Sequence, residues 1–394
     1  MSPFDELQRI AGEAGIGPAL DYLEQNVRRD KNYPALFEVL KMRVRHRLEL
    51  PLLYSDNPDS LTEQQQRELE DGLISACREV GTLLMRTGDV QQGWMYLQPV
   101  GDRELNQKLL QAIKPDEENI DLLIDTAIAQ GAAPAFGYKL LLNHYGTCNG
   151  ITTFETQSAA FDRTTQKEMA VVLLDHLYNE LLDNIRYSMS LPDSDAPLDE
   201  DFEPEIPEEL KQMSLAEILE QRPQLTEHGA HHIDTTHLAS LMRIARLVDD
   251  PDDLRRAYQL SRYGNQLAED FHYPGHPPFE QTYVDHLHYF GALVGEINAE
   301  DAVAHFRQKI SSVDTEQFGP VAIETVVELL FRLGNNEAAL ELTIEKLLGQ
   351  HAPMGIAPDP MSIANTEAMR QKLIEYYRSQ NDLVSFAAGV LGHG

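Results

Sequence analysis

The clearest structural signal in the sequence is CREVGTLLMRTGDVQQGWMYLQPV, from Cys77 to Val100. Its first half has the spacing of one helical face, with large, large, small and large residues at Cys77, Val80, Gly81 and Leu84. A turn signal follows at Gly88-Asp89, and helical spacing resumes at Gly93, Leu97 and Val100. The stretch therefore predicts two helices joined by a tight turn.

This pattern resembles the tetratricopeptide repeat, a helical hairpin of about 34 residues. Similar spacing precedes Gly334, at Ile323, Val326, Val327 and Leu330, and a shorter version lies at His286, Tyr289, Phe290 and Leu293, followed by Ala302 and Phe306. Val327 and Phe290 stand where the family has a small residue, and no regular period links the segments. The resemblance covers roughly a quarter of the chain. It implies an all-α fold of helical hairpins stacked as an irregular α-α superhelix, and a scaffold or adaptor that binds a protein or peptide.

The chain of 394 residues divides into three parts by composition. Residues 1–190 predict an N-terminal helical region with the repeat-like unit near 74–100, and residues 211–394 predict a second repeat-like helical region. Residues 191–210 read as an acidic, proline-rich linker, because they offer almost nothing apolar to bury. Within the first region, residues 143–161 are small and β-branched and predict a loop or a short strand.

The stretch from Glu227 to Phe290 holds eight of the fourteen histidines. Asp234 is a natural N-cap for a helix, and Pro251 suits the first turn of the next helix. Residues 273–278 are too rich in proline to be helical. If these helices alternate up and down, the start of the first, the end of the second and the start of the third meet at one edge.

Histidines and carboxylates at such an edge suggest a site for zinc, iron or manganese, since imidazole and carboxylate groups are common ligands. The candidate ligands are His232, Asp234, His237, His272, His276, Asp285 and His286. A metal-dependent enzyme that uses the cluster at 231–286 is therefore the alternative to a scaffold, and a small-ligand or metal-responsive module is a third hypothesis. No ordered signature such as HExxH is present. The scaffold is favoured, with no cofactor expected unless the cluster binds a divalent metal.

The net charge of −32 at pH 7 argues against nucleic acid and anionic membranes as partners, because both would be repelled at long range. It favours a basic protein partner, or simply supports solubility. No apolar run reaches the roughly 20 residues that span a bilayer. The start of the sequence lacks the features of a signal peptide, and two cysteines fit a reducing compartment, so a cytoplasmic protein is expected.

A local basic run stands out against this acidity, at Lys41, Arg43, Arg45, His46 and Arg47. It lies on the outer side of a predicted helix. The run suggests either a site for a phosphate or an acidic partner, or a solvated helix face paired with nearby carboxylates, and the second is favoured.

Overall fold

The computed structural model of the chain describes residues 2–53, 61–191, 204–348 and 356–392. The regular elements in these ranges are helices, with one isolated bridge between Pro274 and Gln281, which confirms the predicted all-α class. Contacts divide the chain into an N-terminal unit, Met1–Gly150, and a C-terminal unit, Ile151–Gly394. None of the helices in the described ranges has the length and apolarity needed to cross a membrane.

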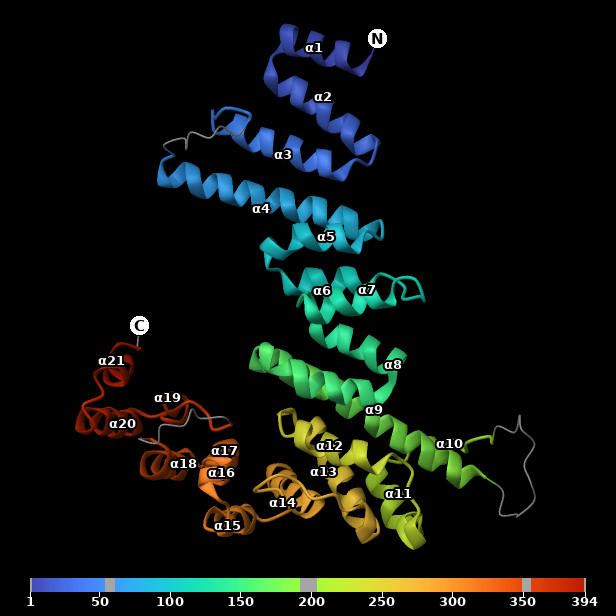
Figure 1. Ribbon diagram of the computed structural model, residues 1–394, viewed down its shortest axis with the longest axis vertical. Helices are drawn as coiled ribbons and strands as arrows, with labels where there is room; N and C mark the ends of the chain where they lie inside the picture. The colour runs from blue at the N-terminus through green and yellow to red at the C-terminus, as the bar shows by residue number, and fades with distance from the viewer. Residues whose placement is uncertain (1, 54–60, 192–203, 349–355, 393–394) are drawn as a thin grey trace. The chain divides into compact units, whose positions relative to one another are not determined.

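The N-terminal unit is a series of helices in which each of the first four packs against the next (Figure 1). The helices are α1 Pro3–Ala14, α2 Ile16–Arg29, α3 Tyr33–Arg47, α4 Glu63–Arg86, α5 Val90–Leu97, α6 Arg103–Gln111, α7 Ile120–Ile124 and α8 Pro134–Gln157, the last of which continues past the unit boundary. Short 3-10 and π turns follow α5 and α7, at Gln98–Val100 and Asp125–Ala129. Buried residues of α4 to α7 form an apolar core around Met85, Trp94, Leu97, Leu110 and Leu123.

Residues 77–100 form the second half of α4, the turn and α5, as predicted. The turn needs Gly88, whose φ of 85° is in the region that favours glycine, and Asp89 caps α5 by accepting a hydrogen bond from Gln92 N. Gly81 and Gly93 lie where α4 and α5 approach each other most closely. A Cβ on Gly81 would lie 2.7 Å from Leu97 Cγ and 2.9 Å from the Gly93 carbonyl oxygen.

Gly81→Ala is therefore expected to lower the free energy of unfolding of the N-terminal unit by about 1–3 kcal/mol, because the added methyl group must displace backbone. Urea unfolding followed by the fluorescence of Trp94, the only tryptophan and a member of this core, measures the effect. Gly12→Ala is the control, since a Cβ on Gly12 meets nothing within 4 Å and alanine is the better helix former. If Gly81→Ala unfolds at the same urea concentration as the parent, α4 and α5 do not approach each other closely at Gly81.

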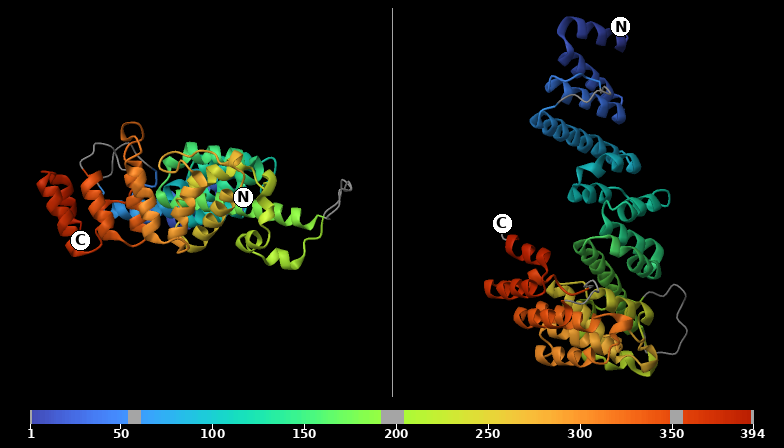
Figure 2. Two further views of the ribbon diagram at one scale, coloured as in Figure 1. Left: turned by 90° about the horizontal axis from the view of Figure 1, so that it is seen from below. Right: turned by 60° about the vertical axis from the view of Figure 1, so that its left-hand side comes forward.

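The C-terminal unit begins with the long helix α9, Arg163–Ser190, which packs against α12 and α13. The remaining helices are α10 Glu208–Gln212, α11 Leu215–Gln221, α12 Thr235–Ala245, α13 Pro251–Gln266, α14 Thr282–Val294, α15 Ala299–Ile310, α16 Thr315–Phe318, α17 Val321–Arg332, α18 Asn336–Leu342, α19 Pro360–Ile363, α20 Glu367–Ser379 and α21 Leu383–Leu391. Short 3-10 segments lie at Ser158–Ala160, Pro223–Gly229 and Glu269–Phe271, and a π turn lies at Thr343–Leu347. From α17 to α21 each helix packs against the next (Figure 2).

Two features differ from the sequence-based expectation. The contact boundary falls at residue 150 and not at the acidic segment, because α9 packs with the helices that follow that segment. Residues 192–203 of the predicted linker lie outside the described ranges. The expectation of a loop or a short strand at residues 143–161 is wrong, because most of these residues belong to α8. Gly146, with a φ of 80°, kinks α8, so no single helical period runs across the stretch.

Candidate functional site

The edge predicted from the histidine-rich stretch does form. Asp234 caps α12 by accepting hydrogen bonds from the backbone N–H groups of Thr236 and His237, at 2.8 and 3.2 Å. The Tyr283 hydroxyl in α14 donates to the Thr235 carbonyl oxygen at 3.3 Å, and the Tyr273 hydroxyl lies 3.3 Å from Thr235 Oγ1. The start of α12, the proline-rich loop and the start of α14 therefore meet at one edge of the C-terminal unit.

The histidines at this edge have separate environments. His272 and His276 are exposed, and the His272 ring packs edge-on to Tyr283, 5.4 Å between ring centroids. His232 and His237 are half-buried. The His232 backbone N–H donates to the Tyr263 hydroxyl at 2.9 Å, while its Nδ1 is buried without a hydrogen-bond partner among the described residues. Burial, together with a neighbouring histidine, lowers the pKa of His232.

Asp285 is the centre of a buried hydrogen-bond network. Its carboxylate has no exposed surface and accepts from His305 Nε2 and Lys309 Nζ, both at 2.7 Å, and from the Gln281 backbone N–H at 2.8 Å. Lys309 Nζ also donates to Glu280 at 2.7 Å. Burial acts to raise the pKa of Asp285, but the hydrogen bonds from His305 and Lys309 outweigh it and hold the pKa below its usual value. Donors already surround both carboxylate oxygens.

His286 is completely buried and stacks between two aromatic rings. Its ring centroid lies 4.4 Å from that of Phe279 and 5.8 Å from that of Phe290. Nδ1 donates to the Thr282 carbonyl oxygen at 2.6 Å, and Nε2 has no hydrogen-bond partner among the described residues. Burial, reinforced by Arg246, lowers the pKa of His286 to about 3. His286 is therefore a neutral core residue.

These placements bear on the predicted metal ligands. Across the ranges that the structure describes, no group of three or more His, Cys, Asp or Glu side chains has an arrangement that could hold a metal ion. Asp234 serves as a helix cap, and Asp285 binds a histidine and a lysine. The metal site stays a prediction for which the described geometry provides no ligand set.

A cleft of about 740 Å³ lies elsewhere in the C-terminal unit, between the start of α9, the α12–α13 connection and the end of α17. Its apolar lining consists of Leu247, Pro251, Leu254, Leu293, Phe331, Ile356, Ala357 and Pro358, and its charged lining of Arg163, Lys167, Asp249, Glu328 and Arg332. Lys167 is paired with Asp249, and Arg163 lies 3.5 Å from Glu328. A concave, largely apolar site with a few convergent polar groups is typical of binding pockets.

Three arginines act on Glu328, and two of them, Arg163 and Arg332, also line the cleft. Arg163 forms the ion pair, while Arg332 and Arg246 contribute favourable electrostatic interactions. Tyr289 adds a hydroxyl that accepts from Arg332 at 3.2 Å and is hydrogen-bonded to Glu328. Burial raises the pKa of the Glu328 carboxyl. The arginines act to lower this pKa, but burial outweighs them, so it stays above its usual value. We call these residues the arginine cluster.

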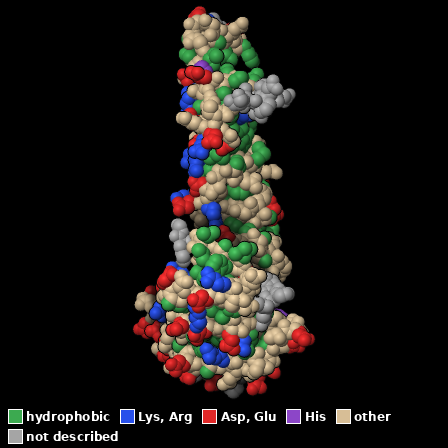
Figure 3. All heavy atoms as spheres, turned by 90° about the vertical axis from the view of Figure 1, so that its left-hand side faces the viewer, with side chains coloured by type: hydrophobic (Ala, Val, Ile, Leu, Met, Phe, Trp, Pro, Cys, Tyr) green, Lys and Arg blue, Asp and Glu red, His purple; other side chains and the backbone are tan. Residues whose placement is uncertain are grey.

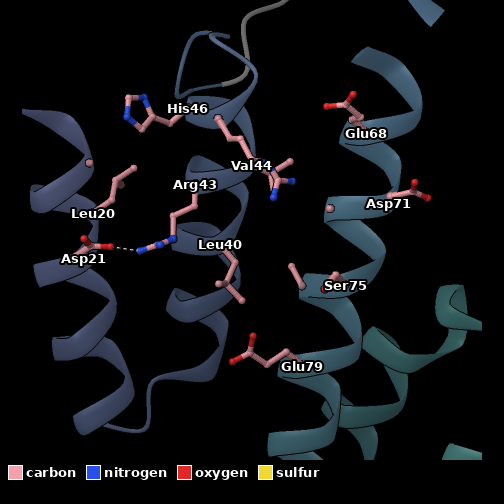
Figure 4. A pocket seen from close by; sticks show the side chains of 14 residues that line it. Leu20, Asp21, Leu40, Arg43, Val44, His46, Glu68, Asp71, Ser75 and Glu79 are labelled. Atoms are coloured by element: carbon pink, nitrogen blue, oxygen red, sulfur yellow. Dashed lines mark hydrogen bonds and ion pairs between the residues drawn. The ribbon is translucent and has the colours of Figure 1, made fainter. Parts of the chain in front are cut away.

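The N-terminal unit has a second cavity of about 720 Å³, between α2, α3 and α4 (Figure 4). It contains part of the basic run. Arg43 extends toward Asp21 and pairs with it, and it also pairs with Glu24 at 2.9 Å. Lys41 pairs with Glu38 at 3.0 Å. For Lys41 and Arg43 the prediction of a helix face paired with carboxylates is confirmed.

Sequence reasoning missed the cleft. One signal was present, because Glu324, Glu328 and Arg332 are charged residues spaced four apart in the mostly apolar helix VAIETVVELLFR. Arg163, the partner of Glu328, lies 165 positions earlier, and nothing local links the two segments. The charged surface offers no such guide, since acidic and basic side chains are interspersed on the face seen in Figure 3. Comparison with protein-family models, curated proteins and solved structures found no match to this chain.

Proposed function

We propose that the chain is a helical scaffold that binds an extended segment of a partner protein in the C-terminal cleft. The observation that carries the proposal is the cleft itself, with about 740 Å³ of space, an apolar lining and charged groups at its base. Apolar walls can bury the side chains of a peptide, and fixed charges can orient it. The resemblance of residues 77–100 to the tetratricopeptide repeat supports a binding role.

The chemistry of the lining also supports binding over catalysis. Four of its five charged side chains form ion pairs within the lining, Lys167 with Asp249 and Arg163 with Glu328. The described lining contains no serine, cysteine or histidine that a neighbouring base could activate as a nucleophile. Such a set of groups can position a ligand without changing it.

Filling the cleft tests the proposal. Ala357 is a half-buried lining residue, so Ala357→Trp places a large ring in the cleft with little disturbance of the core. The full chain and this variant are each used to select from a displayed library of random peptides. We expect the parent to enrich related peptides, and the variant to bind those peptides at least about tenfold more weakly, a loss of about 1.4 kcal/mol.

Ala304→Trp is the matched control, because Ala304 is exposed on α15 and is not part of the cleft lining. It should enrich the same peptides as the parent with the same affinity. If the parent enriches no related peptides, the proposed function is wrong. If Ala357→Trp keeps full affinity, the peptides bind elsewhere and the cleft is not the site.

A further inference from the structure

The arginine cluster carries more positive charge than the carboxylate inside it can balance. Arg163, Arg246 and Arg332 act on the single carboxylate of Glu328, which has a side chain only 8% exposed. Counted over the whole charged lining, three basic side chains face two acidic ones. This local excess lies in a chain whose net charge is −32. A desolvated excess charge is costly unless a counter-charge binds it.

Arg332 shows how the excess arises. Its guanidinium donates to the carbonyl oxygens of Arg246 and Val248 and to the Tyr289 hydroxyl, all neutral acceptors. These bonds fix the group at the end of α12 without cancelling its charge. Among the described residues no carboxylate lies within ion-pair distance of Arg332 or Arg246. The Arg246 guanidinium instead lies over the Phe279 ring, 4.4 Å from its centroid.

Arg163 is the member of the cluster that a ligand can reach. Its side chain is 48% exposed, and its ion pair with Glu328 is a single long contact of 3.5 Å. A guanidinium has five N–H donors in a planar fork, so most of those on Arg163 remain available for a second carboxylate. Lys167 lies one helical turn further along α9 and also lines the cleft.

We propose that the arginine cluster binds the carboxylate of an acidic side chain in the partner segment, with Arg163 as its direct ligand and apolar side chains of the segment against the cleft walls. This inference rests on the proposed function. A single carboxylate matches the excess of one positive charge in the lining, whereas a phosphate dianion would be repelled by Glu328 and Asp249. Arg332 supplies a fixed positive potential behind the contact.

The acidic character of the whole chain does not oppose this contact. Charges farther away than a Debye length, about 8 Å at physiological ionic strength, are largely screened, whereas the cluster acts at contact distance. The net charge of −32 still favours partners that are basic overall. The partner segment is therefore expected to place one acidic residue among apolar and basic ones.

The test uses the peptides selected by the full chain from the random library. We expect them to share one Asp or Glu flanked by apolar residues. Changing that residue to Asn or Gln should weaken binding to the parent about tenfold, as expected for loss of a charge-assisted pair. Arg163→Gln should bind the acidic and amide peptides equally, and Arg163→Lys should restore part of the preference. Arg255→Gln, on the exposed side of α13 and 62% exposed, should keep the full preference.

Three results would overturn the inference, and they separate it from the proposed function. Selected peptides that share apolar positions but no acidic one would refute the anion site and leave the cleft as a peptide site. A tenfold preference that survives in Arg163→Gln would show that the acidic residue binds elsewhere. Failure of the library to yield related peptides would remove both proposals. Unchanged thermal unfolding of Arg163→Gln confirms that the variant is folded in each comparison.

Discussion

Asp285→Asn is expected to lower the free energy of unfolding of the C-terminal unit by about 3–5 kcal/mol, the usual cost of breaking a buried ion pair by removing one partner. The carboxylate accepts from His305, Lys309 and the Gln281 backbone, and none of it is exposed. An amide keeps the shape but turns one acceptor into an NH₂ donor, which would face another donor. Among the described residues, Glu280 would be the one carboxylate left within ion-pair distance of Lys309.

Hydrogen exchange by mass spectrometry is the suitable measurement, because it reports on α14 and α15 separately from the N-terminal unit. Peptides from these helices should exchange much faster in Asp285→Asn than in the parent. Asp183→Asn is the control, since that carboxylate is 75% exposed on α9 and its ion pair with Arg186 is 3.7 Å long. Asp183→Asn should lower the free energy of unfolding by at most about 1 kcal/mol. Equal protection of α14 in Asp285→Asn and the parent would show that the network is not a source of stability.

Histidine 286 is expected to make the C-terminal unit acid-sensitive. Burial, with Arg246 and Arg243, disfavours its charged form more than Asp285 and the Thr282 carbonyl favour it, and its pKa is lowered to about 3. The unfolded chain binds a proton at this histidine below about pH 6.5, and the folded chain does not. The free energy of unfolding therefore falls as the pH falls through this window, by about 1.4 kcal/mol per pH unit.

His286→Phe removes this dependence while keeping an aromatic ring between Phe279 and Phe290. When the pH is lowered from 7.5 to 5, the free energy of unfolding should fall in both proteins. The fall should be about 2 kcal/mol smaller in the variant than in the parent. Urea unfolding followed by circular dichroism at the two pH values gives the difference. His276→Ala, which removes an exposed histidine, should keep the dependence of the parent. If His286→Phe and the parent lose the same stability, His286 is protonated in the folded chain.

Local signals in the sequence were sufficient for individual helix boundaries. Asp234 was expected to cap a helix because its side chain accepts from the next turn, and α12 begins at Thr235. Pro251 was expected in a first turn because it needs no hydrogen-bond donor there, and it is the first residue of α13. At residues 143–161, where a loop or strand was expected and α8 is found, local signals were misleading. Gly146 interrupts the helical period, and burial of Ile151 and Phe154 compensates for their weaker helix propensity.

The candidate site could be predicted only in part. The expectation that helices with short connections alternate up and down correctly indicated that the start of α12, the end of α13 and the start of α14 meet. It did not indicate what each side chain does there. His286 has the residue type of a ligand but is buried between rings, and Asp285 is occupied by Lys309. The type and spacing of residues do not determine where a side chain points, because this depends on how the surrounding helices pack.

By itself, the sequence determined the helical class, the α4–α5 hairpin and the caps that begin its helices, because these depend on residues within a few positions of each other. Only the tertiary structure decided where the charged groups converge. Arg163 begins α9, Glu328 and Arg332 lie on α17, and these distant segments line the same cleft. Electrostatic interactions act through space, so residues 165 positions apart can form one site that no local pattern reveals.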